Sequence, residues 1–292
     1  ARKWRIFTEN AGSFLQNLRK EIDARQKWLE TVLTGEKKWI LENQGPEGEF
    51  YMNGSKAGDV NPYFACMAAL GLLAETKNCP ITETEKKAVG RYLDWHTGIL
   101  LETDGKMGIY RKESGKLIYK EKADSEDGYL GMYLFLMGKY LEKTESTDLP
   151  EYWKKGISLA LKKIQSLMQD GITKVSEENT TVYLMDNLEV WKGLYELEHA
   201  GLKDVQAIRE MRNKLQAQIE KLFWDDANQR WRIIENSDLY HQKEFYPDGV
   251  AQIYPLIYEF PVKEKKKQKI LYKQFTERFQ WQKLNKKRNG FL

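Results

Sequence analysis

The sequence predicts an all-α protein built from helical hairpins that close toward a ring. Amphipathic segments alternate along the chain with segments that are apolar on nearly every side, and short turn-rich stretches separate them. A helix that is apolar all round must be buried all round, whereas an amphipathic helix covers a core. Stacked pairs of covering and buried helices close naturally into a ring with the buried helices inside.

The outer and inner helices can be placed in order along the chain. Outer helices are predicted over residues 11–33, 83–98, 150–168 and 205–223. Inner helices are predicted over residues 63–75, 123–141, 188–199 and 249–260. Asn61 should cap the first inner helix, with Pro62 at its first position. Short β-hairpins are expected at 105–120 and 171–183, and extended chain with a turn at 224–235.

Composition places the chain among globular proteins. Its 292 residues are 41% apolar and 31% charged, enough for one large domain, and we expect residues 1–292 to form a single domain. No apolar run reaches the ~18 residues of a membrane span. Cys66 and Cys79 make no disulfide framework, and Cys66 should belong to the core. No histidine has metal-ligand spacing, and no phosphate-binding glycine loop occurs, so neither a metal nor a cofactor is expected.

The net charge of +4 conceals an uneven distribution. Residues 263–288 contain eleven Lys or Arg and two Glu, so the rest of the chain is acidic. A basic segment can bind nucleic acid or another anionic polymer. However, Ile270, Leu271, Phe275 and Phe279 recur at helical spacing, which favours a solvated outer helix and no nucleic-acid partner.

An aspartate heads each inner helix, and the four heads are Asp59, Asp127, Asp186 and Asp248, 59 to 68 residues apart. In a chain of helical hairpins every second helix points the same way, so these N-termini should converge at one end. Carboxylates beside aromatic rings suit glycoside chemistry, in which one carboxyl protonates the leaving oxygen and another activates water or attacks the sugar. The candidate catalytic residues are Asp127 first, then Asp124, Asp186, Asp248 and Glu49. The candidate cleft residues are Tyr63, Trp95, Tyr129, Tyr246, His241 and Asn61.

Four motifs resemble the six-hairpin glycosidases: VNPYFA at 60–65, DSEDGYL at 124–130, MDNLEV at 185–190 and YPDGVAQ at 246–252. Within that superfamily, the chain is similar to bacterial, often exported, members. The resemblance implies an (α/α)6 toroid with the active site at the N-termini of the inner helices, and an Asp or Glu pair acting on a poly- or oligosaccharide. Four inner helices are clear, so the predicted ring is short of six hairpins.

Several alternatives stay open at this point. The spacings Asp124-x-x-Asp127 and Asp186-x-x-Glu189 also fit a helix cap with its box partner, and acidic residues in a first turn are favoured by the helix dipole. The chain is a hydrolase, a non-catalytic carbohydrate-binding toroid used in cell-surface polymer assembly, or a polysaccharide lyase. We expect a monomer located extracellularly or in the cell envelope, with a cytoplasmic location as the alternative.

Overall fold

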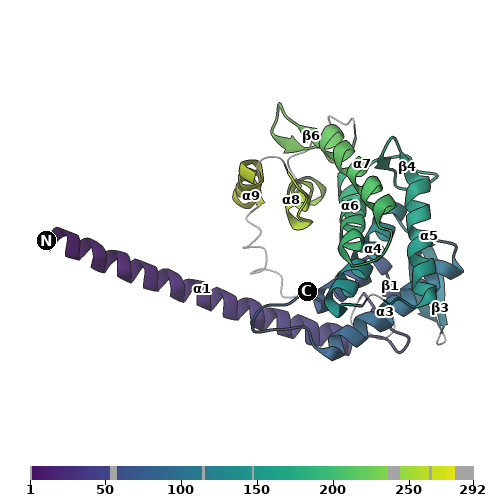
Figure 1. Cartoon of the computed structure of the whole chain (residues 1–292), viewed down its shortest axis with the longest axis horizontal. Coiled ribbons are helices and arrows are strands. Elements are labelled where there is room, and N and C mark those ends of the chain that lie inside the picture. The colour runs from purple at the N-terminus through teal and green to yellow at the C-terminus, as the bar shows by residue number, and fades with distance from the viewer. Residues whose placement is uncertain are drawn as a thin grey trace.

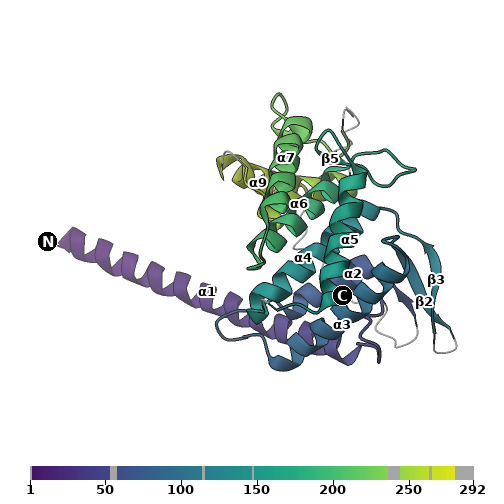
Figure 2. The ribbon, with the colours of Figure 1, turned by 45° about the vertical axis from the view of Figure 1, so that its right-hand side comes forward.

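The computed structural model describes residues 2–52, 58–113, 116–146, 148–235, 244–262 and 265–279. Over these ranges the chain is mostly α-helical with short antiparallel strand pairs, which confirms the all-α fold class (Figures 1 and 2). The outer helices are α1 (Arg2–Glu42), α3 (Glu83–Glu102), α5 (Glu151–Leu167), α7 (Gln206–Phe223) and α9 (Lys265–Phe279). The inner helices are α2 (Pro62–Leu72), α4 (Glu126–Thr144), α6 (Leu184–His199) and α8 (Val250–Ile257), and the π-helical turn η1 (Phe245–Gly249) precedes α8.

The inner helices pack side by side in chain order, α2 on α4, α4 on α6 and α6 on α8, while each outer helix covers its inner partner. None of the helices described is long and apolar enough to cross a membrane. Helix α1 differs most from prediction. It runs from Arg2 to Glu42 instead of residues 11–33, and its N-terminal part projects away from the other helices (Figure 1).

The most extensive helix contact joins α4 to α6 and depends on glycine. A Cβ atom on Gly193 of α6 would lie 2.3 Å from the carbonyl oxygen of Gly131 on α4, and one on Gly138 would lie 2.5 Å from the backbone of Glu196. These distances are shorter than any Cβ atom tolerates, so the two backbones can approach this closely only because glycine has no side chain. The glycines among the apolar residues of α4 therefore fix the spacing of the inner layer.

The helix starts show which polar residues act as caps. Asn61 accepts a hydrogen bond from the backbone N–H of Tyr63, and Pro62 occupies the first turn of α2, as predicted. Helix α4 is capped by Ser125, whose Oγ accepts from the N–H of Gly128. Tyr183 is the cap position of α6 and makes no side-chain cap bond. The capping boxes suggested for Asp124-x-x-Asp127 and Asp186-x-x-Glu189 are therefore wrong. Asp127 and Asp186 do lie in the first turns of α4 and α6, where the helix dipole favours negative charge.

Three small antiparallel sheets join the helices. The first contains β1 (Asp59–Val60), β2 (Gly108–Glu113) and β3 (Lys116–Lys122), and it confirms the hairpin predicted at 105–120. The third pairs β6 (Trp224–Asp225) with β7 (Arg230–Trp231), as the predicted turn requires. Between them, β4 (Met168–Gln169) pairs with β5 (Ile172–Thr173).

The hairpin predicted at residues 171–183 forms only in part. The N–H of Val175 donates to the carbonyl of Thr181 at 3.0 Å, but residues 180–183 form no strand. The strand pair lies earlier, because the chain also turns at Asp170 and Gly171, whose φ angles are +52° and +87°. Tyr183 instead bridges to Ile234, far along the sequence. A long-range pairing of this kind leaves no local signal in the sequence.

The assignment of Asp59 as the head of an inner helix is also wrong. Asp59 lies on β1, where its carboxylate accepts hydrogen bonds from Arg111 at 2.6 Å and from Lys120 at 2.7 Å. The hydrogen bond from Arg111, followed by the one from Lys120, lowers the pKa of Asp59 to about 2. Asp59 therefore holds the sheet together, and Asn61 heads α2.

Candidate active site

Two adjoining cavities lie where the inner helices begin. The larger has a volume of about 720 Å³ and lies between the starts of α4 and α6, the segment after β7, and η1. The smaller, about 240 Å³, lies among the first turns of α2, α4 and α6 and the tyrosines of η1 and α8. Both are lined by Asp124, Ser125, Met185, Asp186 and Tyr246. The shared lining makes them one depression, named here the mouth, and confirms that the inner-helix N-termini converge.

Two carboxyl groups lie side by side at the mouth, one turn apart on α6. Asp186 is half-buried and lines both cavities, whereas Glu189 is 2% exposed and lines the smaller one. A Cβ atom on Gly128 would lie 2.7 Å from Oε2 of Glu189 and 3.7 Å from Cγ of Asp186, so both carboxyl groups reach the first turn of α4. Gly128 leaves the space that they occupy.

Hydroxyl groups hold Glu189 from the side of α2 and α8. The Tyr63 hydroxyl donates to Oε1 of Glu189 at 2.5 Å, and that of Tyr258 donates to the same oxygen at 3.4 Å. The Tyr63 hydroxyl lies 3.3 Å from that of Tyr254. Three tyrosines thus surround one buried carboxyl group, and none of them carries a charge that would neutralise a carboxylate.

Burial and repulsion from neighbouring carboxylates keep protons on Asp186 and Glu189. Burial raises the pKa of Asp186 to about 8, and the negative charge of Asp127 adds to the shift. Burial also raises the pKa of Glu189 well above its ordinary value, with the charge of Asp186 as the next cause. Neighbouring carboxyl groups in a poorly solvated site cannot all ionise, so they share protons at neutral pH. A protonated carboxyl group at the wall of a cavity can act as a general acid.

Asp127, the first catalytic candidate from the sequence, lies behind the mouth. Its carboxyl group is fully buried and lines neither cavity. It accepts hydrogen bonds from the Thr173 hydroxyl at 2.7 Å, the Ser125 hydroxyl at 2.8 Å and the N–H of Gly128 at 3.0 Å. Burial raises its pKa to about 6, although these hydrogen bonds oppose the shift. Asp127 joins α4 to β5 and increases the negative potential at Asp186.

The other predicted carboxylates lie in different surroundings. Asp124 is exposed at the rim and lines both cavities. Asp248 lines the larger cavity with only 4% exposure, and its buried Oδ2 has no hydrogen-bond partner among the residues described. Glu49 is buried in its own loop, where it accepts from the Tyr51 hydroxyl at 2.6 Å and from the N–H of Glu47 at 3.0 Å. The structure does not bring Glu49 to either cavity.

Four of the six predicted cleft residues lie at the mouth. Asn61, Tyr63 and Tyr129 line the smaller cavity, and Tyr246, which is 65% exposed, lines both. Trp95 lies instead in the core of α3, stacked on Tyr92 at a ring distance of 5.7 Å. Its large apolar surface is covered because α3 turns that face inward. His241 lies outside the described residues.

Sequence reasoning named Tyr63 but missed Glu189, Tyr254 and Tyr258 as site residues. The available signal was a second carboxyl group three residues after Asp186, on the same face of the helix start. Tyr254 and Tyr258 carry a similar signal, because they are four residues apart and therefore share a helix face. Over the described part of the chain, no group of three or more His, Cys, Asp or Glu side chains is placed to hold a metal ion.

The raised carboxyl pKa values predict that stability falls as pH rises through neutrality. A group with a raised folded-state pKa holds its proton longer in the folded chain, so the free energy of unfolding decreases as pH rises from the ordinary carboxyl value toward the folded one. Because the pKa of Asp186 is raised to about 8, the range from pH 7 to pH 8 is the most informative one for this measurement. His96, whose pKa burial lowers to about 3, is neutral in the folded chain throughout this window, and in the unfolded chain it is mostly neutral above its ordinary pKa of 6.5.

We expect the free energy of unfolding of the wild type to fall between pH 7 and pH 8, by at most about 1.4 kcal/mol per pH unit for each titrating carboxyl group. The melting temperature should fall with it. Asp186→Asn should flatten this slope, because it removes one group and lowers the repulsion on Glu189. Calorimetry at several pH values measures both slopes. Equal slopes in the two proteins would contradict the raised pKa of Asp186.

The architecture is similar to that of solved glycosidases. No family model matches the sequence, and no curated protein sequence matches it. A glycosidase with a glutamate-to-alanine substitution aligns with a TM-score of 0.54 at 12% identity, over 72% of this chain and 61% of that chain. A second such glycosidase, in complex with glucose, aligns with a TM-score of 0.51 at 12% identity, over 72% of this chain and 61% of that chain. A rhamnosidase from Klebsiella oxytoca with rhamnose bound aligns with a TM-score of 0.53 at 9% identity, over 84% of this chain and 48% of that chain. The chain spans less than two thirds of each of these proteins, and over the aligned part it has their helical, glycosidase-like fold.

Proposed function

We propose that this chain is a glycoside hydrolase, or the catalytic part of one, that acts on a poly- or oligosaccharide. The observation that carries the proposal is the proton-bearing pair Asp186 and Glu189 at a mouth that also contains Asp124 and several tyrosines. The glycosidase-like fold supports it, as do the sugars bound to two of the similar proteins.

Asp186 is the proposed general acid. Its side chain reaches both cavities, and its raised pKa leaves a proton available at neutral pH. It would donate that proton to the glycosidic oxygen as the bond from this oxygen to the anomeric carbon breaks. Burial and the negative charges of Asp127 and Asp124 keep the pKa of Asp186 high. Glu189, held by the hydroxyl groups of Tyr63 and Tyr258, would stay protonated beside it.

Asp124 is the proposed partner carboxylate. It lies at the exposed rim of the same two cavities, where water or a sugar can reach it. It would either take a proton from the attacking water or attack the anomeric carbon itself, the two roles that the second carboxylate has in glycosidases. Asp248, which is only 4% exposed, would form part of the wall of the larger cavity.

Aromatic residues would hold the sugar rings. Phe64 and Tyr246 are exposed at the mouth by 50% and 65%, and Tyr129 lies deeper in the smaller cavity. Their rings offer apolar faces to the C–H faces of a pyranose. Among the residues that the structure describes, neither Arg nor Lys lines either cavity, and the lyase alternative needs a cation to neutralise a uronate. The lining therefore favours hydrolysis over elimination.

A screen for reducing-end release from a panel of poly- and oligosaccharides tests the proposal. We expect release from at least one neutral glycan at pH 6 to 7, where Asp186 carries its proton. Absorbance near 235 nm, which a lyase product would show through its new double bond, should stay flat. Retention of a glycan without any release would contradict hydrolysis and support the non-catalytic binding toroid.

A further inference from the structure

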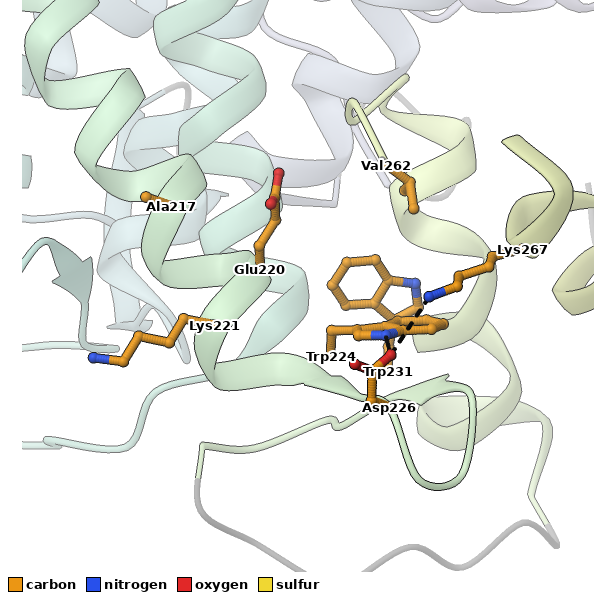
Figure 3. A pocket seen from close by; sticks show the side chains of 8 residues that line it. All are labelled: Ala217, Glu220, Lys221, Trp224, Asp226, Trp231, Val262 and Lys267. Atoms are coloured by element: carbon orange, nitrogen blue, oxygen red, sulfur yellow. Dashed lines mark hydrogen bonds and ion pairs between the residues drawn. The ribbon is translucent and has the colours of Figure 1, made fainter. Parts of the chain in front are cut away.

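A separate cavity of about 480 Å³ lies at the C-terminal end of α7, outside the mouth (Figure 3). Its lining includes Ala217 and Glu220 of α7, Trp224 of β6, Trp231 of β7 and Lys267 of α9. Its volume lies within the range of about 300–1,000 Å³ that is typical of small-molecule sites. None of these residues takes part in the chemistry proposed above.

The floor of this cavity is a pair of indole rings. Trp224 is half-buried and Trp231 is 1% exposed, and their rings meet edge to face with centroids 5.1 Å apart. Figure 3 shows the two indoles between Glu220 on one side and Lys267 on the other. A half-buried tryptophan held in one orientation by a second tryptophan provides a preorganised apolar platform.

Polar groups hold Trp224 at its edge. Its Nε1–H donates to Oδ1 of Asp226 at 2.8 Å, and Nζ of Lys267 lies 3.4 Å from the same oxygen. Lys267 also lies 5.0 Å from the centroid of the Trp224 ring. The platform thus has a carboxylate and an ammonium group at its margin, and both can exchange hydrogen bonds with hydroxyl groups.

The charges around the cavity suit a neutral ligand. Two acidic side chains, Glu220 and Asp226, and two basic ones, Lys221 and Lys267, line it, and Asp226 is already paired with Lys267. Among the lining side chains that the structure describes, neither sign is in excess, so they do not favour an ionic ligand. An apolar platform with mixed donors and acceptors at its edge matches a neutral sugar ring, which has apolar C–H faces and hydroxyl groups around its rim.

The cavity lies at the same end of the helical layers as the mouth. Helices α6 and α7 form a hairpin, so the C-terminal end of α7 lies beside the N-terminal end of α6. The segment 231–234 connects the two sites, because Trp231 lines this cavity whereas Ile233 and Ile234 line the larger cavity of the mouth. A glycan chain that occupied both sites would therefore have to cross this segment.

We propose that the Trp224 cavity is an accessory binding site for a neutral sugar residue of a longer polysaccharide. This inference rests on the proposed function for the identity of the ligand. The site would hold a distal part of the chain whose other part enters the mouth, so it would increase affinity for polymers more than for short oligosaccharides.

The test measures polysaccharide binding without turnover. Affinity electrophoresis in gels containing a β-glucan, a mannan, a xylan or the acidic polygalacturonate compares Asp186→Asn with Asp186→Asn/Trp224→Ala. We expect the second protein to bind a neutral polymer about three- to tenfold more weakly, as loss of one aromatic stacking contact implies. Asp186→Asn/Trp28→Ala is the matched control, because Trp28 is 62% exposed on α1 and outside the cavity.

A second variant guards against misfolding. Ala217→Arg fills the cavity from an exposed helical position without removing either indole, and it should weaken retention as Trp224→Ala does. Equal retention of all these proteins, no retention of any polymer, or preference for polygalacturonate would overturn the inference. If the Trp224→Ala variant lost retention and the wild type released no reducing ends, the result would support the accessory binding site and contradict the hydrolase proposal.

Discussion

Asp186→Asn is expected to lower the rate of reducing-end release by about 10²–10⁴-fold, the usual contribution of a positioned general acid. Asparagine keeps the size and the hydrogen-bonding shape of the side chain but has no proton to give to the glycosidic oxygen. Because Asp186 lies beside Glu189 and near Asp127, the substitution also removes charge repulsion. The variant should therefore be no less stable than the wild type, while its kcat falls.

Two comparisons separate catalysis from folding. Asp204→Asn changes an exposed turn residue with a φ angle of +58°, which asparagine tolerates, and it should leave both rate and melting temperature unchanged. Asp127→Asn alters a buried group that accepts three hydrogen bonds and should lower the melting temperature first. If Asp186→Asn kept full activity while Asp127→Asn lost it at unchanged stability, the proposed roles of these two residues would be reversed.

The sequence could not distinguish these two aspartates, although it predicted the end of the fold where they lie. Asp127 is the second residue of α4 and Asp186 is the third residue of α6. One residue turns a side chain by about 100° around a helix, which here separates a buried hydrogen-bonding position from the wall of a cavity. Helix starts inferred from sequence are uncertain by at least that much. The inner helices themselves were predictable because a helix that is apolar on nearly every side must be buried on nearly every side.

Features that depend on pairing between distant segments were not predictable. Asp59 pairs with Arg111 and Lys120 only because β1 joins the sheet of β2 and β3, and Thr173 reaches Asp127 only because β5 reverses at Gly171. Glu189 looked like a capping partner by its spacing, and only the packing of α2 and α8 against α6 gives it Tyr63 and Tyr258. Local patterns thus located the mouth, and long-range packing decided which carboxyl groups reach it.

Gly193→Ala is expected to destabilise the protein by about 1–3 kcal/mol, toward the upper end of that range. The added Cβ would lie 2.3 Å from the carbonyl oxygen of Gly131 and 3.1 Å from Cβ of Leu134. A clash with backbone cannot be relieved by a side-chain rotation, so α4 and α6 must move apart. Gly98→Ala on α3 is the matched control, because nothing lies within 4 Å of its Cβ position. It should stabilise the chain by about 0.4–1 kcal/mol, since it restricts the unfolded chain and adds a better helix former.

The same substitution should also impair the mouth. Gly193 lies one turn beyond Glu189 on α6, and Gly131 lies one turn beyond Asp127 on α4, so separating these helices shifts Asp186 away from Asp124. Urea denaturation of both glycine variants measures stability, and assays well below the unfolding transition measure the rate for the protein that remains folded. We expect Gly193→Ala to lose activity in excess of its unfolded fraction, whereas Gly98→Ala keeps the wild-type rate. A Gly193→Ala protein as stable as Gly98→Ala would show that the inner layer does not depend on close contact between α4 and α6. It would also contradict the view that this contact positions Asp186 and Glu189.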